Sequence, residues 1–172
     1  MIPFADRGKL RHMGMTLSND EISDLRHKHY NASVIAVRHV HDELMVIRVR
    51  PDGGTPEYQA GQYTTLGLGF WEPRVPDTQH EPLSDADHFK VVKRAYSISF
   101  PILDDAQRLL RRTDCDFLEF YVVLVRETPG TPPALTPRLF GLAPGDRLFV
   151  GPKITGHYTL APVVQGQDIV FL

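Results

Sequence analysis

Short segments rich in β-branched and aromatic residues follow one another along the chain from Asn31 onward, with glycine, proline or charged residues between them. Residues 33–37 and 44–49 are separated only by the short polar segment 39–43, and this spacing predicts an antiparallel hairpin. Further strands are predicted at residues 62–68, 91–100, 117–125, 148–150, 157–160 and 168–172. This many short strands with little helix predicts a mainly β fold, a closed or nearly closed antiparallel barrel.

Helices are predicted at two places. Ser18 can cap a helix that runs to about Tyr30, with acidic residues in its first turn. Because its apolar positions are sparse, we expect this helix either to pack on the surface or to fray. After the proline-rich linker 129–133, Thr136 followed by Pro137 is typical of a helix start. There a hydroxyl caps free backbone amides and proline fits the first turn.

Two other segments are less regular. Residues 103–112 form either a short helix or a wide turn. Residues 70–90 contain three prolines and many acidic residues, and we expect an inserted, solvated loop there. Glycines in and beside the run 62–68 predict a bend or a close approach by another group.

Composition limits the class of protein. The 172 residues, 42% hydrophobic and 23% charged, suffice for one buried core and a short second element. A net charge of −2 gives no reason to expect nucleic acid or an anionic membrane as partner. No apolar stretch reaches the length of a membrane span and the first residues lack a secretory signal. The single cysteine, Cys115, fits a reducing environment, so we expect a cytoplasmic protein.

Histidine pairs do not make a convincing metal site. His27 with His29 and His39 with His41 are two residues apart, but residues at that spacing do not share a helix face, and no cysteine or carboxylate cluster accompanies them. No metal site is predicted.

The run from Arg94 to Ser99 carries the strongest chemical signal. Arg94 offers a planar fork of donors for phosphate oxygens, and Tyr96 offers a ring face and a hydroxyl. Ser97 adds a small donor and acceptor. The alternative is an ordinary strand with an exposed arginine and a half-buried tyrosine. Period-two alternation places Arg94 and Tyr96 on one face and Ser97 on the other.

The helix start at Thr136 is the second signal. Free amides and the positive end of the helix dipole favour an anion there. Together with Arg94, it offers complementary means of holding a pyrophosphate. The alternative is a plain cap on a surface helix.

Five short motifs in order resemble the ferredoxin–NADP(+) reductase superfamily, in particular the bacterial-type ferredoxin/flavodoxin–NADP reductases. They are Ala60-Gly61-Gln62-Tyr63, Arg94-Ala95-Tyr96-Ser97, the strand 118–125, Leu135-Thr136-Pro137-Arg138-Leu139, and Pro144-Gly145-Asp146 with Gly151-Pro152-Lys153. The resemblance covers roughly residues 31–162. It implies a six-stranded antiparallel Greek-key barrel capped by a short helix, which binds FAD.

The resemblance also implies roles for single residues. Arg94, with Ala95 beside it, would pair with the FAD pyrophosphate, and Tyr96 would contact the flavin and ribityl portion. Ser97 would lie near the flavin nitrogen that accepts hydride, the one catalytic candidate, which requires the strand to present its edge to the cofactor. Contacts largely through backbone are implied for Tyr121, Val122, Val123 and Leu124. Leu135 and Thr136 would bind phosphate at the helix start.

The implied domain organisation is an N-terminal extension at 1–30, an FAD-binding barrel at 31–162 and the start of a truncated NADP-binding domain at 163–172. That second domain's glycine-threonine-glycine loop is absent from the chain. The intact protein would be an FAD-dependent oxidoreductase that moves electrons between NADP(H) and ferredoxin or flavodoxin. Segment 70–90 is longer than the compact hairpin expected there.

Two other function classes stay open at this point. A non-enzymatic FAD- or nucleotide-binding barrel, or an electron-transfer subunit module, would explain the missing nicotinamide domain. A barrel that binds single-stranded nucleic acid is disfavoured, because the net charge is acidic and no basic stripe alternates with aromatic residues. The sequence fixes neither the electron acceptor nor the oligomeric state.

Overall fold

The computed structural model describes residues 17–101, 103, 106–111, 114–157, 159 and 166. In chain order its elements are α1 (Asn19–His29), β1 (Ala32–His41), β2 (Leu44–Pro51), β3 (Tyr63–Gly69), the 3-10 helix η1 (Asp87–Phe89), β4 (Val91–Ser97), β5 (Leu118–Val123), α2 (Thr136–Leu139) and β6 (Arg147–Val150). The chain is therefore mainly β, as predicted. None of the helices in these ranges is long and apolar enough to cross a membrane.

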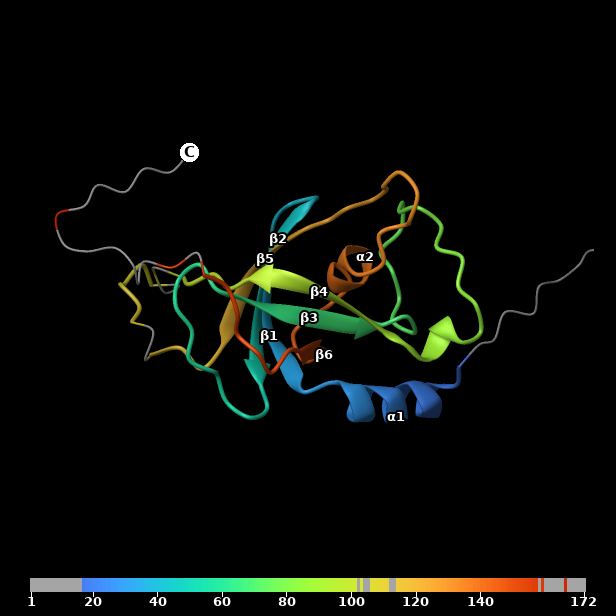
Figure 1. Cartoon of the computed structure of the whole chain (residues 1–172), viewed down its shortest axis with the longest axis horizontal. Coiled ribbons are helices and arrows are strands. Elements are labelled where there is room, and N and C mark those ends of the chain that lie inside the picture. Colours follow the sequence, from blue (N-terminus) through green and yellow to red (C-terminus); the bar gives the residue numbers. More distant parts are fainter. Residues whose placement is uncertain are drawn as a thin grey trace, which may run out of the picture.

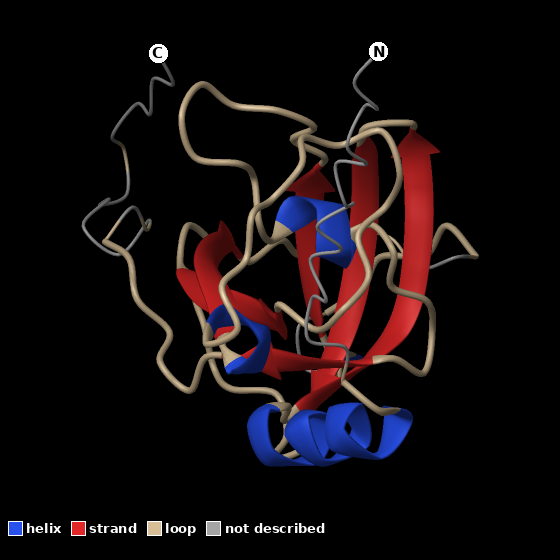
Figure 2. Cartoon of the chain, turned by 90° about the vertical axis from the view of Figure 1, so that its right-hand side faces the viewer, coloured by secondary structure: helices blue, strands red, loops and turns tan. Residues whose placement is uncertain are grey.

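The six strands form one antiparallel sheet in the order β4-β3-β6-β1-β2-β5 (Figure 1). The predicted hairpin is confirmed: β1 and β2 pair from Ala32 opposite Pro51 to His41 opposite Leu44. β6 lies between β1 and β3, so the sheet joins strands that are distant in the sequence. Figure 2 shows α1 across one end of the strands and α2 among them toward the other end.

The two outermost strands of this order, β4 and β5, approach each other. Ser99, just beyond β4, forms an isolated bridge with Glu119 of β5, and its N–H donates to the Glu119 carbonyl at 2.8 Å. This is the only strand pairing between them in the described ranges. The predicted six-stranded antiparallel architecture is confirmed, with its two edges joined at a single point. We call the facing, otherwise unpaired edges of β4 and β5 the seam.

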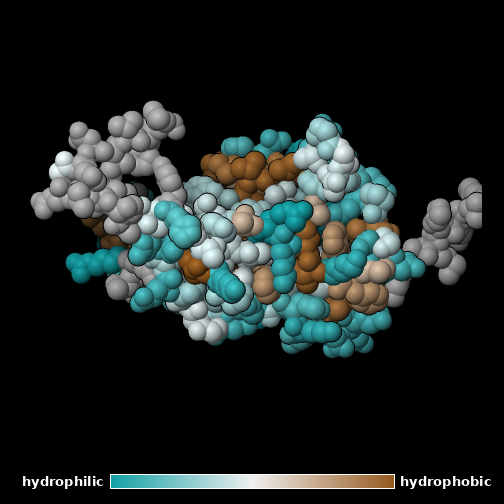
Figure 3. All heavy atoms as spheres, viewed as in Figure 1, coloured by the Kyte–Doolittle hydropathy of each residue, from teal (hydrophilic) through white to brown (hydrophobic). Residues whose placement is uncertain are grey.

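A continuous core fills the inner side of the sheet and reaches α2. Its largest fully buried side chains are Phe120, Met45, Ile47, Leu66, Leu68, Leu118, Leu139 and Leu148. Each such side chain contributes about 1.5–3 kcal/mol by leaving water. On the face shown in Figure 3, hydrophilic residues separate the hydrophobic areas.

Helix α1 begins where the sequence predicts. The Ser18 hydroxyl accepts the N–H of Glu21 (3.3 Å), and the Glu21 carboxylate accepts the N–H of Ser18 (2.8 Å), which makes a reciprocal capping box. No α1 residue is buried, so the predicted surface position is also confirmed.

The buried carboxylate of Glu72 fixes α1 to the barrel. It accepts the Nε and Nη2 of Arg26 (2.8 and 2.6 Å), the hydroxyl of Tyr30 (3.0 Å) and the Nε1 of Trp71 (3.0 Å). The Tyr30 hydroxyl in turn accepts the N–H of Gly69. Burial raises the pKa of Tyr30 above its ordinary value of 10.0. The hydroxyl therefore stays protonated and donates a hydrogen bond to Glu72.

The predicted close approach in the third strand occurs at Gly69. A Cβ atom there would lie 2.1–2.3 Å from atoms of the Trp71 ring. Glycine is therefore required at the end of β3 because the Trp71 indole lies directly against its backbone.

Three other predictions need correction or narrowing. Segment 70–90 is not simply solvated, because Glu72 is buried and the side chain of Glu81 is only 8% exposed. The described part of 103–112 is a wide turn with a bridge between Leu103 and Leu109, not a helix. In 157–160, His157 and Thr159 lie in bends, and the bridge instead joins Thr155 to Tyr63. The other two residues of that predicted strand, and the strand 168–172, lie outside the described residues.

Candidate functional site

The register between β3 and β4 places Arg94 and Tyr96 on the core side of the sheet. Arg94 lies opposite Leu66 and Tyr96 opposite Thr64, and both β3 residues are buried. Directly opposed residues of an antiparallel pair share a face. Arg94 is nevertheless exposed, because β4 is the outermost strand and the core ends there.

The Arg94 guanidinium is available to a ligand. Its Nη1 donates to the neighbouring carbonyl of Lys93 (2.8 Å), and among the described residues it forms no ion pair. Tyr96 beside it is partly buried against the core. That burial raises the pKa of Tyr96 to about 12, although the charge of Arg94 acts in the opposite direction. Tyr96 is therefore a neutral hydrogen-bonding phenol at physiological pH.

Ser97 and Ala95 have their side chains on the other face of β4, as the alternation predicts. Both residues are exposed, and Ser97 lies opposite Tyr63 and Ala95 opposite Thr65. A ligand lying flat on one face would not reach Arg94 and Ser97 together. A ligand at the edge of the strand is within reach of both.

The backbone groups of β4 that face the seam can be identified because successive residues point their N–H and C=O groups to alternate edges of the strand. Ile98 donates its N–H to the Gln62 carbonyl on the β3 side, whereas Ser99 donates to Glu119 on the β5 side. Backbone groups alternate between the two edges of a strand. The N–H and C=O groups of Ala95 and Ser97 therefore face the seam.

The same argument holds for β5. Leu124 donates its N–H to the Glu43 carbonyl on the β2 side, and Glu119 accepts from Ser99 on the seam side. The backbone groups of Tyr121 and Val123 therefore face the seam. Their side chains are 52% and 58% exposed, whereas those of Val122 and Leu124 are buried.

The start of α2 lies at the end of this edge. Val125 continues the alternation of β5, and its N–H donates to the Thr136 hydroxyl (3.1 Å). The prediction that the Thr136 hydroxyl caps the helix is therefore wrong: Leu135 is the N-cap residue, without a side-chain cap. The hydroxyl ties α2 to β5, and among the described residues it donates to no acceptor.

The predicted site residues thus fall into two groups. The seam brings together the exposed side chain of Arg94, the half-buried ring of Tyr96, the seam-facing backbone of four residues and the hydroxyl of Thr136. Those four residues are Ala95, Ser97, Tyr121 and Val123. By contrast, Val122 and Leu124 direct their backbone toward β2 and their side chains into the core, and the Leu135 side chain is also buried. These three residues pack in the core beneath the seam, and their side chains do not line it.

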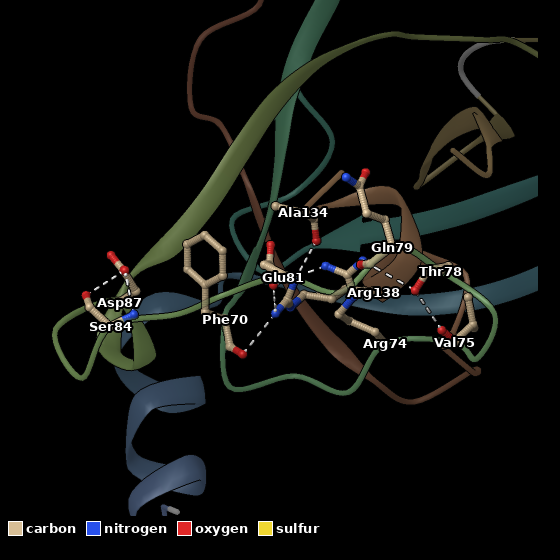
Figure 4. Close-up of polar contacts among 10 residues, drawn as sticks. All are labelled: Phe70, Arg74, Val75, Thr78, Gln79, Glu81, Ser84, Asp87, Ala134 and Arg138. Atoms are coloured by element: carbon tan, nitrogen blue, oxygen red, sulfur yellow. Dashed lines mark hydrogen bonds and ion pairs between the residues drawn. The ribbon is translucent and has the colours of Figure 1, made fainter. Parts of the chain in front are cut away.

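Sequence reasoning missed a group of buried charges behind α2. Arg138 is 2% exposed and pairs with Glu81 (2.7 Å), which also pairs with Arg74 (3.1 Å). Figure 4 shows these three side chains converging between the 70–90 segment and α2. An arginine between the hydrophobic neighbours Pro137 and Leu139 is the available signal, but its ionic partner Glu81 lies 57 positions away in the sequence.

Two of the paired histidines have other contacts in the described structure. His39 packs edge-on against Phe140, and the His41 ring accepts the N–H of Glu43. Across the described residues, no three metal-ligating side chains gather in one place.

Comparison with known proteins finds similarity in structure only. No family model matches the sequence, and no curated protein matches it. The CS-b5R domains of human Ncb5or (NAD+ form) align over 76% of this chain and 30% of theirs, at 16% identity and a TM-score of 0.50.

Two further solved structures match less closely in shape. A ferredoxin NADP+ reductase from Neisseria gonorrhoeae with bound FAD and NADP covers 74% of this chain and 38% of its own, at 18% identity and a TM-score of 0.45. The ferredoxin reductase in carbazole 1,9a-dioxygenase covers 74% and 28%, at 23% identity and a TM-score of 0.42. The chain thus spans well under half the length of each of these three structures. The strand order and the similarity to the CS-b5R domains of Ncb5or show that this chain, a mainly β protein with a six-stranded antiparallel sheet, shares its fold with part of those domains.

Proposed function

We propose that this chain is the FAD-binding part of a flavoprotein oxidoreductase. The observation that carries the proposal is the seam, where β4 and β5 are bridged at Ser99 and Glu119 and otherwise leave their facing backbone groups unpaired among the described residues. Unpaired strand edges are normally covered or paired. A flat ligand lying along this edge would satisfy them.

The residues at the seam fit the parts of FAD. The guanidinium of Arg94 is exposed and free of ion pairs in the described structure, which suits it to a pyrophosphate. At the end of the same edge, the Thr136 hydroxyl has no acceptor within the described ranges and can donate to a ligand. The neutral ring of Tyr96 and the amides of Ser97 and Tyr121 suit an uncharged, planar ring system.

When bound, FAD supplies the electron-transfer chemistry, while the protein binds and orients it. Ser97 has its backbone on the seam and its hydroxyl exposed, so we assign it to the flavin ring. The role of this residue is to orient the ring by hydrogen bonding.

The wider activity is proposed on the likeness in fold. Matched structures include a ferredoxin NADP+ reductase with bound FAD and NADP and a ferredoxin reductase. We propose NADP(H) as the hydride donor, bound by a further domain, and ferredoxin or flavodoxin as the electron acceptor.

FAD binding by two adjacent variants tests the assignment. Arg94→Ala should weaken FAD binding by about 1.5–3 kcal/mol, the loss of one charged hydrogen-bonding group. Lys93→Ala is the matched control, because Lys93 is the next residue of β4 but lies on the opposite face, with its ammonium over the Phe149 ring at 3.8 Å. Equal FAD affinity of Arg94→Ala and the unmodified chain, measured by quenching of flavin fluorescence, would refute the assignment.

A further inference from the structure

Arg138 holds the chain just before α2 by several hydrogen bonds. Its Nη1 donates to the Ala134 carbonyl (2.6 Å), and its Nη2 donates to the Phe70 carbonyl (3.1 Å) and to Glu81 Oε2 (2.7 Å). The guanidinium also lies over the Phe70 ring, 5.0 Å from its centroid. One buried side chain therefore ties the residue two positions before Thr136 to the 70–90 segment.

The 70–90 segment supplies the other half of this arrangement. Glu81 is shared between Arg138 and Arg74, and the Arg74 Nη2 donates to the Gln79 carbonyl (2.9 Å). A separate backbone contact, from Val75 N–H to the Pro137 carbonyl (3.0 Å), joins the same loop to α2. The segment is thus attached to the helix start through side chains, which Figure 4 shows, and through this backbone contact.

A gain in folding stability does not explain why these three charged side chains are buried together. Two guanidinium groups share one carboxylate, so the cluster keeps an excess positive charge although its side chains are only 2–17% exposed. The Nε of Arg138 is buried and has no hydrogen-bond partner in the described structure. Buried ion groups of this kind are often no more stable than apolar replacements, because desolvation offsets their attraction. What the cluster does provide is a fixed geometry.

We propose that the Arg74–Glu81–Arg138 cluster is a positioning device through which the inserted 70–90 segment fixes the start of α2 for phosphate. This inference rests on the proposed function, because α2 would hold the FAD phosphate. The cluster acts through Ala134, whose carbonyl accepts from Arg138, and through the backbone that leads from Ala134 to Thr136. None of the three side chains needs to touch the cofactor.

The reasoning predicts a specific pattern of effects. Lysine at position 138 keeps the charge but cannot donate to three acceptors from one planar group. The start of α2 would then lose its fixed geometry, while the seam around Ser97 and Tyr121 would be unchanged. FAD should bind more weakly, yet the visible absorption spectrum of the bound flavin should stay the same.

The experiment compares Arg138→Lys with the matched control Arg147→Lys in the full chain. Arg147 also forms an ion pair, with Asp52, and also donates to a serine hydroxyl and a backbone carbonyl, but it lies on β6. For each variant, FAD affinity is measured by flavin fluorescence, the bound spectrum by absorbance, and stability by urea unfolding. Glu81→Gln provides a second variant from within the inserted segment, should Arg138→Lys not fold.

Arg138→Lys and Glu81→Gln should each raise the FAD dissociation constant about tenfold, with an unchanged bound spectrum. Arg147→Lys should lower stability but alter FAD affinity by less than about twofold, because it is a separate site. Unchanged FAD affinity in the folded cluster variants would overturn the inference, and so would an equal loss in Arg147→Lys or an altered spectrum. Failure of the unmodified chain to bind FAD would reject the proposed function itself, which is a different outcome.

Discussion

Replacing Gly69 by alanine tests the packing that joins β3 to α1. The added Cβ would lie 2.1–2.3 Å from the Trp71 ring, against 3.4–4 Å for ordinary contact. The ring must therefore move by at least about 1 Å, and in a close-packed interior neighbouring groups resist such a shift. Trp71 is held by its hydrogen bond to Glu72 (3.0 Å) and by the stacked Tyr30 ring, whose centroid lies 5.9 Å from that of the indole.

Two costs follow from that shift. Overpacking by one methyl group typically costs about 1–3 kcal/mol. The hydrogen bond from Trp71 to the charged Glu72 is worth about 1.5–3 kcal/mol if it breaks. The ring can relieve the clash partly by giving up this hydrogen bond, so the two costs do not fully add. We expect the free energy of unfolding to fall by about 2–4 kcal/mol, which lowers the melting temperature by about 5–15 °C.

Urea unfolding and thermal melts of Gly69→Ala measure this loss. Gly53→Ala is the control, because a Cβ there meets nothing within 4 Å, and it should change stability little. In the double variant Gly69→Ala/Trp71→Ala the clash is gone, so its loss should be smaller than the sum of the two single losses. A Gly69→Ala protein as stable as the unmodified chain, or a double variant with fully additive losses, would refute the reasoning.

Two further predictions concern ionisation. The hydrogen bond from Arg147 holds the pKa of Asp52 below its ordinary value of 3.8, so the stability gained from this pair is present above that value and is lost as the pH falls through the lower folded-state pKa. The unfolding free energies of Asp52→Asn and the unmodified chain should therefore differ at neutral pH and converge in acid, whereas a constant gap across this range would count against the pair. Burial raises the pKa of Tyr96 to about 12, so the folded chain keeps this phenol neutral above pH 10.0 and loses stability as the pH rises further. In an ultraviolet titration of the folded protein, Tyr96→Phe should have one tyrosine fewer among those that ionise well above pH 10.0 than the unmodified chain. If the missing tyrosine instead ionises near pH 10.0, the buried position of Tyr96 is contradicted.

Local patterns in the sequence predict most of the fold. β-branched runs with short polar breaks predict the strands and the β1–β2 hairpin, since the signal lies within a few residues. The capping box at Ser18 is similarly local. The predicted strand 157–160 is not formed at its two described residues, because a short polar-aromatic run carries no such alternation and the nearby pairing joins Thr155 to Tyr63.

The candidate site is predicted only in part, because its contacts are distant in sequence. Arg94 and Tyr96 stand out by residue type, and alternation already separates Ser97 from them. The hydroxyl of Thr136 looks like a cap in the sequence, but the N–H of Val125 occupies it in the fold. Likewise, only the folded chain brings Glu81 to Arg138 (2.7 Å).

Amide hydrogen exchange with and without FAD tests the seam most directly. The amides of Ala95, Ser97, Tyr121 and Val123 face the seam, whereas those of Tyr96 and Val122 face the neighbouring strands β3 and β2. The account predicts that FAD slows exchange in the first group and leaves the second unchanged, because the second is already hydrogen-bonded. Absence of any FAD-dependent protection at the seam, or protection confined to another part of the chain, would contradict the central claim.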